Sequence, residues 1–378
     1  MIIGLDGKRA VSNLTGLGNY SRFIISALNT QFPGNSYKIF APKKRVNREL
    51  DEILRPNTQI LYPENIIAKA FPTLWRSNLI TNDLIHEQID IYHGLSNEIP
   101  IGIEKSGIKS VVTIHDLIFL RYPQYYKPID RKIYNYKFHR ACQTADHIIA
   151  ISECTKRDII NFYNIPDNKI DVVYQGCHPQ FTVPASEEIR HNVRRIYNLP
   201  NRYILFVGTI EQRKNLMLLV RAIKLLPKEI HLVAIGRKTP YAEEVTAYCQ
   251  KQQLTKRVHI IQSVPFHHLP ALYQQAEVFA YPSRFEGFGI PIIEAINSHI
   301  PVLATTGSCL EEAGGNGALY VNPDDAETAS EAINRIITDN RQRNSLIAAG
   351  DEQIKKFAPD VIASGINDVY RKVLRCSL

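Results

Sequence analysis

The stretch from Tyr281 to Thr305 reads YPSRFEGFGIPIIEAINSHIPVLAT, and its pattern predicts a loop followed by a helix. Pro291 precedes a run of apolar residues, and proline is favoured at the first position of a helix because its missing N–H would have no partner there. We therefore expect a helix that begins at Pro291. Glu286 then lies in the loop before the helix and Glu294 in its first turn or just beyond, with seven residues between them.

The beginning of this helix is predicted to bind an anion. The backbone N–H groups of Phe288, Gly289 and Ile290 would point out of the helix start, where they have no partner within the helix and the helix dipole favours negative charge. Glycine also lets a ligand approach the backbone closely. Two carboxylates that accept hydrogen bonds from hydroxyl groups, on either side of a phosphate, suit a nucleotide-sugar. Glu294 taken alone would also fit an ordinary acidic residue of a first helical turn.

A second segment repeats the pattern of a strand followed by a polar turn and a helix. Tyr203–Val207 is an apolar strand, and Gly208 and Thr209 follow it. Arg213 and Lys214 stand at the junction with the next helix. Adjacent cations suit a diphosphate, since arginine binds phosphate oxygens with two hydrogen bonds and lysine acts as a point charge. Without the neighbouring residues, a solvated basic turn would explain the pair equally well.

The first part of the chain opens as a doubly wound α/β domain does. Ile2–Leu5 is a short apolar strand, a loop ending in Gly16 and Gly18 follows, and a helix is expected from about Tyr20 to Thr30. The loop does not complete the glycine fingerprint of NAD-binding proteins, and no acidic residue ends the next strand, so a dinucleotide cofactor is disfavoured. His115 follows a Val- and Ile-rich strand, at the edge of the sheet where ligand groups gather.

The composition indicates an ordinary globular protein with an acidic partner. Its 378 residues suffice for two domains, and its net charge of +8 favours a nucleotide, a nucleic acid or an anionic membrane surface. Basic and aromatic residues are mixed between residues 121 and 140. This mixture suits the headgroup zone of an anionic membrane or single-stranded nucleic acid, and a solvated helix with an aromatic inner face fits it as well.

Cysteine usage and hydropathy point to the cytoplasm. The six cysteines form no C-x-x-C pair, which fits reduced thiols, and no charged region followed by a long apolar run predicts a signal peptide at the N-terminus. No apolar run is long enough to predict a membrane span. No D-x-D sequence occurs, so a metal held between two aspartates is not indicated.

Two strings together resemble a known family. F-E-G-F-G-I-P-x-x-E-A, from Phe285, and F-V-G-T-x-x-x-R-K-N-L, from Phe206, are similar to the E-x7-E signature and the donor motif of the retaining GT-B glycosyltransferases of family four. The resemblance implies an α/β GT-B fold, with two Rossmann-like domains facing across a cleft and a C-terminal helix crossing back to the first domain. The implied domains are residues 1–178 for the acceptor, 179–357 for the nucleotide-sugar, and 358–378 for that helix.

The resemblance also implies roles for single residues. Glu286 would hold a hydroxyl of the transferred sugar, Glu294 the ribose, and Arg213 with Lys214 the diphosphate. The implied catalytic residues are Glu286, His115, Lys214 and Arg213. The implied donor-binding residues are Gly16, Gly18, Gly208, Thr209, Arg213, Lys214, Gly236, Val264, Phe288, Gly289, Ile290 and Glu294. No metal and no cofactor are expected, because the nucleotide-sugar is a substrate.

The function implied is transfer of a hexose with retention at the anomeric carbon. The opening GLDGKRA and the segment IYHGLSNEIP look like bacterial mannosyltransferases of surface polysaccharide assembly, so mannose from GDP-mannose and a lipid-linked saccharide are the first expectation. A UDP-sugar with a soluble acceptor is the alternative within the family. A non-catalytic nucleotide or nucleic-acid binding module and a phosphorylase with pyridoxal phosphate are further alternatives. We expect no nucleic acid as partner, and peripheral contact of residues 121–140 with an anionic membrane.

Overall fold

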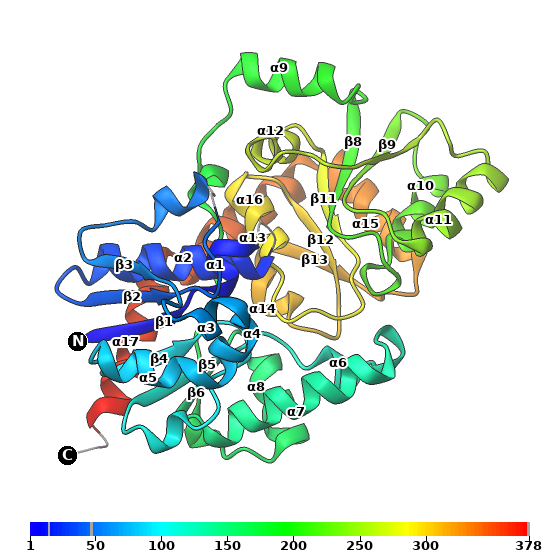
Figure 1. Cartoon of the computed structure of the whole chain (residues 1–378). Helices are drawn as coiled ribbons and strands as arrows, with labels where there is room; N and C mark the ends of the chain where they lie inside the picture. Colours follow the sequence, from blue (N-terminus) through cyan, green and yellow to red (C-terminus); the bar gives the residue numbers. More distant parts are fainter. Residues whose placement is uncertain (14–15, 46–47, 376–378) are drawn as a thin grey trace. The chain divides into compact units, whose positions relative to one another are not determined.

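The chain divides into two compact units, whose residues can be followed by the colour bar of Figure 1. A computed structural model describes residues 1–13, 16–45 and 48–375. The first unit comprises Met1–Gly176 and Lys356–Leu378, and the second comprises Cys177–Lys355. The two changes of unit therefore fall two residues earlier than the ranges expected from the sequence. Each unit is built on its own parallel sheet with helices on its faces, which confirms the expected fold class.

The first sheet has seven strands, and all of its pairings are parallel. In spatial order they are β3 (Thr58–Leu61), β2 (Ser36–Phe40), β1 (Ile2–Asp6), β4 (Ile91–Gly94), β5 (Lys109–Ile114), β6 (His147–Ala150) and β7 (Ile170–Val172). Sequence reasoning missed β3, because its TQIL segment is short and only its last two residues are apolar. The order changes direction between β1 and β4, which makes this point the topological switch of the sheet.

Successive residues of these strands enter different cores, as the pleat of a strand requires. Ile39 and Ile91 belong to a core with the helices α2 (Gly16–Gln31) and α17 (Pro359–Arg375). Phe40 and Tyr92 belong to a second core. Both faces of the sheet are thus covered, so its central strands are apolar along their whole length. The helices of this unit are α1 (Lys8–Ser12), α2 (Gly16–Gln31), α3 (Ile66–Ala70), α4 (Pro72–Leu74), α5 (Ile80–His86), α6 (Ile118–Arg121), α7 (Pro128–Thr144), α8 (Glu153–Tyr163) and α17 (Pro359–Arg375).

The last helix, α17, belongs to the first unit although it follows the second in sequence. It packs on α2 and contributes Ile366 and Tyr370 to the core. The hydroxyl of Tyr370 lies 2.7 Å from Nδ1 of His93, and both side chains are buried. A buried polar pair satisfied in this way fixes the position of the helix on the sheet. The chain therefore completes its first unit only with its last described residues.

The second sheet has six parallel strands. In spatial order they are β10 (Val258–Ile261), β9 (Ile230–Ile235), β8 (Arg202–Val207), β11 (Val278–Tyr281), β12 (Val302–Thr305) and β13 (Ala318–Val321). The helices of this unit are α9 (Glu187–Ile196), α10 (Leu216–Leu225), α11 (Pro240–Lys251), α12 (Leu269–Gln274), α13 (Ile290–Asn297), α14 (Leu310–Gly314), α15 (Ala326–Thr338) and α16 (Asn340–Gln353). Among all described helices of the chain, none combines the length and the apolarity needed to cross a bilayer.

Two helix boundaries differ from the sequence predictions. Helix α2 begins at Gly16 rather than near Tyr20, so Gly16 and Gly18 lie in its first turn and not in a loop. Arg22 explains the earlier start, because its guanidinium donates to the backbone oxygens of Ala10 and Asn13 and ties the preceding segment to the helix. Helix α13 begins at Ile290, one residue before Pro291, with Gly289 as its N-cap at a φ of 124°.

The backbones approach each other closely at the ends of β8 and β9. A Cβ atom added to Gly236 would lie 1.8 Å from the carbonyl oxygen of Gly208. We predict that Gly236→Ala destabilises the protein by about 1–3 kcal/mol, since the two backbones would have to separate. Differential scanning fluorimetry should then show a melting temperature several degrees lower. Gly34→Ala is the control, because a Cβ at Gly34 would meet no atom within 4 Å. Equal melting temperatures for the two variants would contradict the close approach of the backbone at Gly236 and Gly208.

Candidate active site

The candidate site lies at the switch point of the second sheet, at the carboxyl ends of β8 and β11. These strands are neighbours although β9 and β10 separate them in sequence. Open α/β sheets bind ligands outside the strand ends at such a point. Gly208 and Thr209 follow β8, and a short 3-10 helix, η7 (Gln212–Lys214), follows them. Gly236 follows β9 next to Gly208, whose N–H donates to the oxygen of Ile235 at 2.9 Å.

Glu286 lies between the two cations that the sequence singled out. One carboxylate oxygen is 2.9 Å from Nη1 of Arg213, and the other is 2.5 Å from Nζ of Lys214. The hydroxyl of Tyr281 donates to the same oxygen as Lys214 at 3.3 Å. Arg213 also pairs with Glu211 at 2.7 Å. Three separate segments, η7, β11 and the loop before α13, thus meet at one buried carboxylate.

The charges of this cluster depend on one another. Burial alone would raise the pKa of Glu286, but Arg213 and Lys214 outweigh it and lower that pKa to about 2. The carboxylate is therefore ionised throughout the physiological range. Its two oxygens pair with one cation each and so hold the two like charges beside each other. No bound ligand is needed for this arrangement. A diphosphate placed here would meet two cations that are already held in position.

Hydrogen bonds from β12 and from the turn after it fix the loop that carries Glu286. The thiol of Cys309 donates to the backbone oxygens of Glu286 and Phe288, each at 3.0 Å. Thr305 at the end of β12 donates to the oxygen of Ser283. Cys309 and Thr305 are fully buried. These contacts fix the backbone on both sides of the carboxylate before any ligand arrives.

Glu294, the second glutamate, is in a different environment from Glu286. It lies on α13, is 8% exposed and accepts a hydrogen bond from the hydroxyl of Tyr273 at 2.9 Å. No cation within the described residues lies within 4.0 Å of it. Burial therefore dominates and raises the pKa of Glu294 to about 7, although the bond from Tyr273 opposes the shift. The structure thus separates the two glutamates into a permanently charged one and one that titrates near neutrality.

The other residues of the second unit for which the sequence predicts a donor contact lie at the same edge of its sheet. Val264 follows β10 and is half-buried. Phe288 is buried, and Ile290 is the first residue of α13. Val264 thus follows β10 at the edge of the sheet where Gly208 follows β8 and Gly236 follows β9. No set of three or more His, Cys, Asp or Glu side chains that could hold a metal ion occurs in the part of the chain that the structure describes.

His115, Gly16 and Gly18 belong to the first unit, so they form a separate group. His115 follows β5, and its Nε2 lies 2.9 Å from the oxygen of Leu95. Its ring meets that of Tyr20 edge to face at 4.6 Å. Burial lowers the pKa of His115 to about 4, so the imidazole is neutral. Gly18 packs so tightly on Asn13 that a Cβ atom would lie 1.7 Å from its oxygen, whereas Gly16 has open space around it.

Sequence reasoning assigned no individual role to four side chains of the candidate site: Tyr281, Tyr273, Glu211 and Cys309. Tyr281 and Cys309 end or follow strands that the sequence did predict, so the rule that parallel sheets bind ligands at their carboxyl ends could have found both. Nothing in the sequence pattern indicates that Tyr273, on α12, reaches Glu294 on α13. That contact depends on how the two helices pack.

Comparison with known proteins identifies the family of the chain. Residues 17–181 match the family model described as Glycosyltransferase Family 4, and residues 190–353 match that of Glycosyl transferases group 1. O-antigen chain mannosyltransferase B of Escherichia coli is 31% identical over 274 residues, which are 71% of this chain and 70% of that protein. O-antigen chain mannosyltransferase RfbU of Salmonella typhimurium is 29% identical, over 60% of each chain.

A solved structure with the same fold is Anabaena Alr3699/HepE in complex with UDP. It aligns with a TM-score of 0.75 at 15% identity, over 98% of this chain and 99% of that one. Both halves of the chain match family models, and a relative above 30% identity aligns over more than two thirds of both chains. The chain therefore belongs to the glycosyltransferase family four, group 1, and is a hexosyltransferase of the GT-B fold.

Proposed function

We propose that the protein transfers a hexose from a nucleotide-sugar to a hydroxyl group of a saccharide, with retention at the anomeric carbon. The observation that carries this proposal is the ion-pair cluster of Glu286 with Arg213 and Lys214, at the switch point of the second sheet. In this proposal the donor diphosphate lies against the two cations. The N-terminus of α13 adds backbone donors and a favourable dipole.

The reaction proceeds on one face of the sugar. The bond between the anomeric carbon and the diphosphate oxygen breaks, and the nucleoside diphosphate leaves with the electron pair. The acceptor oxygen forms the new bond on the same face, and its proton passes to the departing phosphate oxygen. Arg213 and Lys214 stabilise the charge that develops on the leaving group, which is the largest contribution such sites make. Glu286 positions the sugar through a hydroxyl, and neutral His115 is proposed to contact the sugar as well.

The donor is proposed to be GDP-mannose and the acceptor a lipid-linked saccharide of polysaccharide assembly. The names of the O-antigen mannosyltransferases that align with this chain support the proposal. The alternative is a UDP-sugar, since the HepE structure is a complex with UDP. The chemistry at the diphosphate is the same in both cases. No metal is required, because two side-chain cations take the place of a divalent ion.

Removing either member of the cluster should stop transfer. We predict that Lys214→Ala and Glu286→Gln each lower the turnover of a nucleotide-sugar by at least about 100-fold, because a donor to the leaving group or the group that positions the sugar is lost. The measurement is release of nucleoside diphosphate from GDP-mannose and UDP-glucose with a saccharide acceptor. NMR of the product should show the anomeric configuration of the donor.

Lys224→Ala is the matched control for Lys214→Ala. Lys224 is exposed on α10 of the same unit and bonds Gln252 at 2.7 Å, so its loss should leave turnover unchanged. Circular dichroism of all variants verifies that they are folded. Turnover within a few-fold of the original in folded Lys214→Ala or Glu286→Gln, or inversion in the product, would refute the proposed roles.

The binding of the donor should depend on pH through Glu294. If ionised Glu294 accepts hydrogen bonds from the ribose, donor binding requires that Glu294 has lost its proton. Burial raises the pKa of this carboxyl group to about 7. We predict that affinity for a nucleotide-sugar falls about tenfold for each pH unit below 7 and stays level above it. Calorimetric titration between pH 5 and 9 measures this directly, because the diphosphate of a nucleotide-sugar does not itself titrate there.

Glu294→Gln provides the comparison. The amide cannot ionise, so its affinity should be weaker at pH 8 and nearly constant with pH. An equally steep pH dependence in Glu294→Gln would assign the titration to another group and contradict the proposed contact with the ribose.

A further inference from the structure

The first unit contains a cavity that the donor site does not account for. It has a volume of about 470 Å³, and every residue that lines it belongs to the first unit. Lys8 follows β1, Pro42 and Lys43 follow β2, and Glu98 follows β4. The cavity therefore lies at the carboxyl ends of the strands on both sides of the switch point of the first sheet, where open α/β sheets bind ligands.

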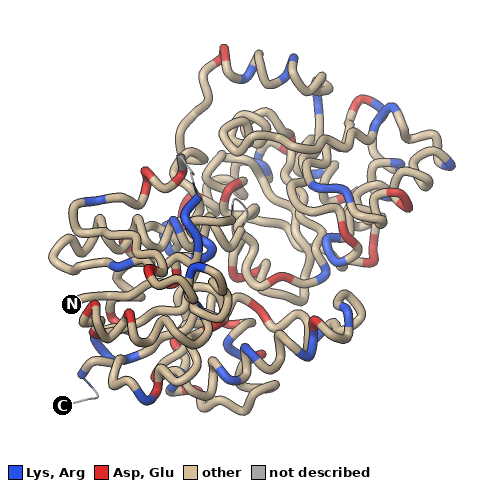
Figure 2. The backbone as a smooth tube through the Cα atoms, viewed as in Figure 1, with Lys and Arg blue, Asp and Glu red and all other residues tan. Residues whose placement is uncertain are grey.

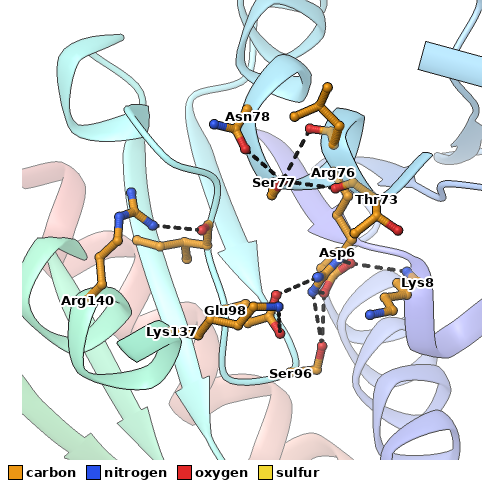
Figure 3. A network of polar contacts seen from close by, with 12 residues as sticks. Asp6, Lys8, Thr73, Arg76, Ser77, Asn78, Ser96, Glu98, Lys137 and Arg140 are labelled. Atoms are coloured by element: carbon orange, nitrogen blue, oxygen red, sulfur yellow. Dashed lines mark hydrogen bonds and ion pairs between the residues drawn. The ribbon is translucent and has the colours of Figure 1, made fainter. Parts of the chain in front are cut away.

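The base of the cavity is a buried ion pair. Asp6, the last residue of β1, receives two hydrogen bonds from Arg76, at 3.0 and 2.6 Å, and one from Ser96. Another nitrogen of Arg76 lies 2.8 Å from Glu98, which Lys137 of α7 approaches to 3.3 Å (Figure 3). Asp6 and Arg76 are both buried. A planar guanidinium fixed in this way cannot turn, so the wall of the cavity is rigid.

Positive charge in the cavity exceeds what these carboxylates balance. The cations that line it are Lys8, Lys43, Arg45, Arg76, Lys137 and Arg140. Of these, Lys8, Lys43 and Arg45 have no carboxylate within 4.0 Å among the described residues. Burial and the neighbouring Arg76 lower the pKa of Lys8, which shows that its charge is poorly compensated. An anion in the cavity would relieve this repulsion.

One side of the cavity is apolar and continues onto the surface of α7. Ile129, Ile133, Tyr136 and Arg140 lie on one stripe of this helix, because they are spaced by three or four residues. Ile129 and Tyr136 are 72% and 66% exposed, whereas Arg140 is mostly buried beside the cavity. The stripe thus runs from exposed apolar side chains to cations. Figure 2 shows how Lys and Arg recur along this helix.

The surface on α3 and α4 adds to this apolar area. Pro72 and Thr73 of α4 line the cavity, and beside them in sequence Phe71 and Leu74 are 60% and 46% exposed. Ile66 at the start of α3 is 85% exposed. Exposed large apolar side chains in several neighbouring segments indicate a surface that contacts another molecule. A cationic cavity with an apolar margin suits an amphiphile with a phosphate at one end.

We infer that this cavity binds the phosphate or diphosphate of an amphiphilic acceptor, whose apolar chain lies along the Ile129–Tyr136 stripe of α7. The inference rests on the proposed function, because it assigns the lipid-linked part of the acceptor to this cavity. Lys137 and Arg140 meet the phosphate from α7. Lys8 meets it from the segment after β1, and Lys43 and Arg45 meet it from the segment after β2. The saccharide attached to the phosphate lies outside the cavity.

Calorimetric titration of the full chain with farnesyl diphosphate, below its critical micelle concentration and without any nucleotide, tests the inference. We expect saturable binding at least about tenfold tighter than that of inorganic diphosphate or of farnesol. The double variant Lys43→Gln/Arg45→Gln should weaken it at least about tenfold, because two charge-assisted contacts are lost. Lys44→Gln is the matched control, since Lys44 is exposed between them and does not line the cavity.

A second variant tests the apolar stripe. Ile133 is 47% exposed, so Ile133→Ser should fold normally, weaken farnesyl diphosphate and leave inorganic diphosphate unchanged. Inorganic diphosphate that binds as tightly as farnesyl diphosphate would overturn the inference in favour of a free phosphate site. So would an absence of binding, or equal affinity in the double variant and the control. These titrations contain no nucleotide-sugar, so a negative result would leave the proposed function intact. The proposed function would be refuted only if the protein transferred sugar from no nucleotide-sugar.

Discussion

The second unit depends on one buried carboxylate. Burying an ion costs several kcal/mol unless a partner of opposite charge accompanies it, and Glu286 meets this condition through Arg213 and Lys214. The pairing joins the end of β8, the end of β11 and the loop before α13, which are far apart in sequence. Without Glu286, two cations would face each other in a buried position. The motif therefore has a structural reason for its composition as well as a proposed chemical one: the same carboxylate keeps in place the two cations that are proposed to bind the donor diphosphate.

The first unit repeats this arrangement with different residues. Asp6 ends β1 beside the switch point and holds Arg76, much as Glu286 holds Arg213 in the second unit. In both sheets a buried carboxylate fixes a guanidinium, and further cations are grouped around it. The two sites differ in their margins: the proposed donor site is bounded by a helix N-terminus and polar turns, whereas the cavity of the first unit opens onto exposed apolar side chains. This difference is what a division between a nucleotide-sugar and an amphiphilic acceptor requires.

Most of the fold could be predicted from the sequence, because parallel strands buried on both faces are continuous apolar runs and the turns after them carry glycine or charge. β10, β12 and β13 have the predicted bounds. β3 could not be found, since its pairing with β2 and not its own pattern makes it a strand. The pairing of Glu286 with Arg213 and Lys214 had no local signal, although the motifs named all three residues. The cavity at Asp6 and Arg76 was missed altogether, because it depends on contacts across 70 residues of sequence.

Glu286, Arg213 and Lys214 are proposed to form a metal-independent site for a nucleoside diphosphate. A thermal-shift panel with GDP, UDP, ADP and dTDP, each with and without magnesium, tests this proposal most directly. A ligand at 100 times its dissociation constant adds about 2.7 kcal/mol of stability, which raises the melting temperature by several degrees. We expect such a rise with GDP, of the same size without magnesium as with it. A rise with UDP instead would support the site and change the donor. No rise with any nucleotide, or a rise only when magnesium is present, would contradict a metal-independent site.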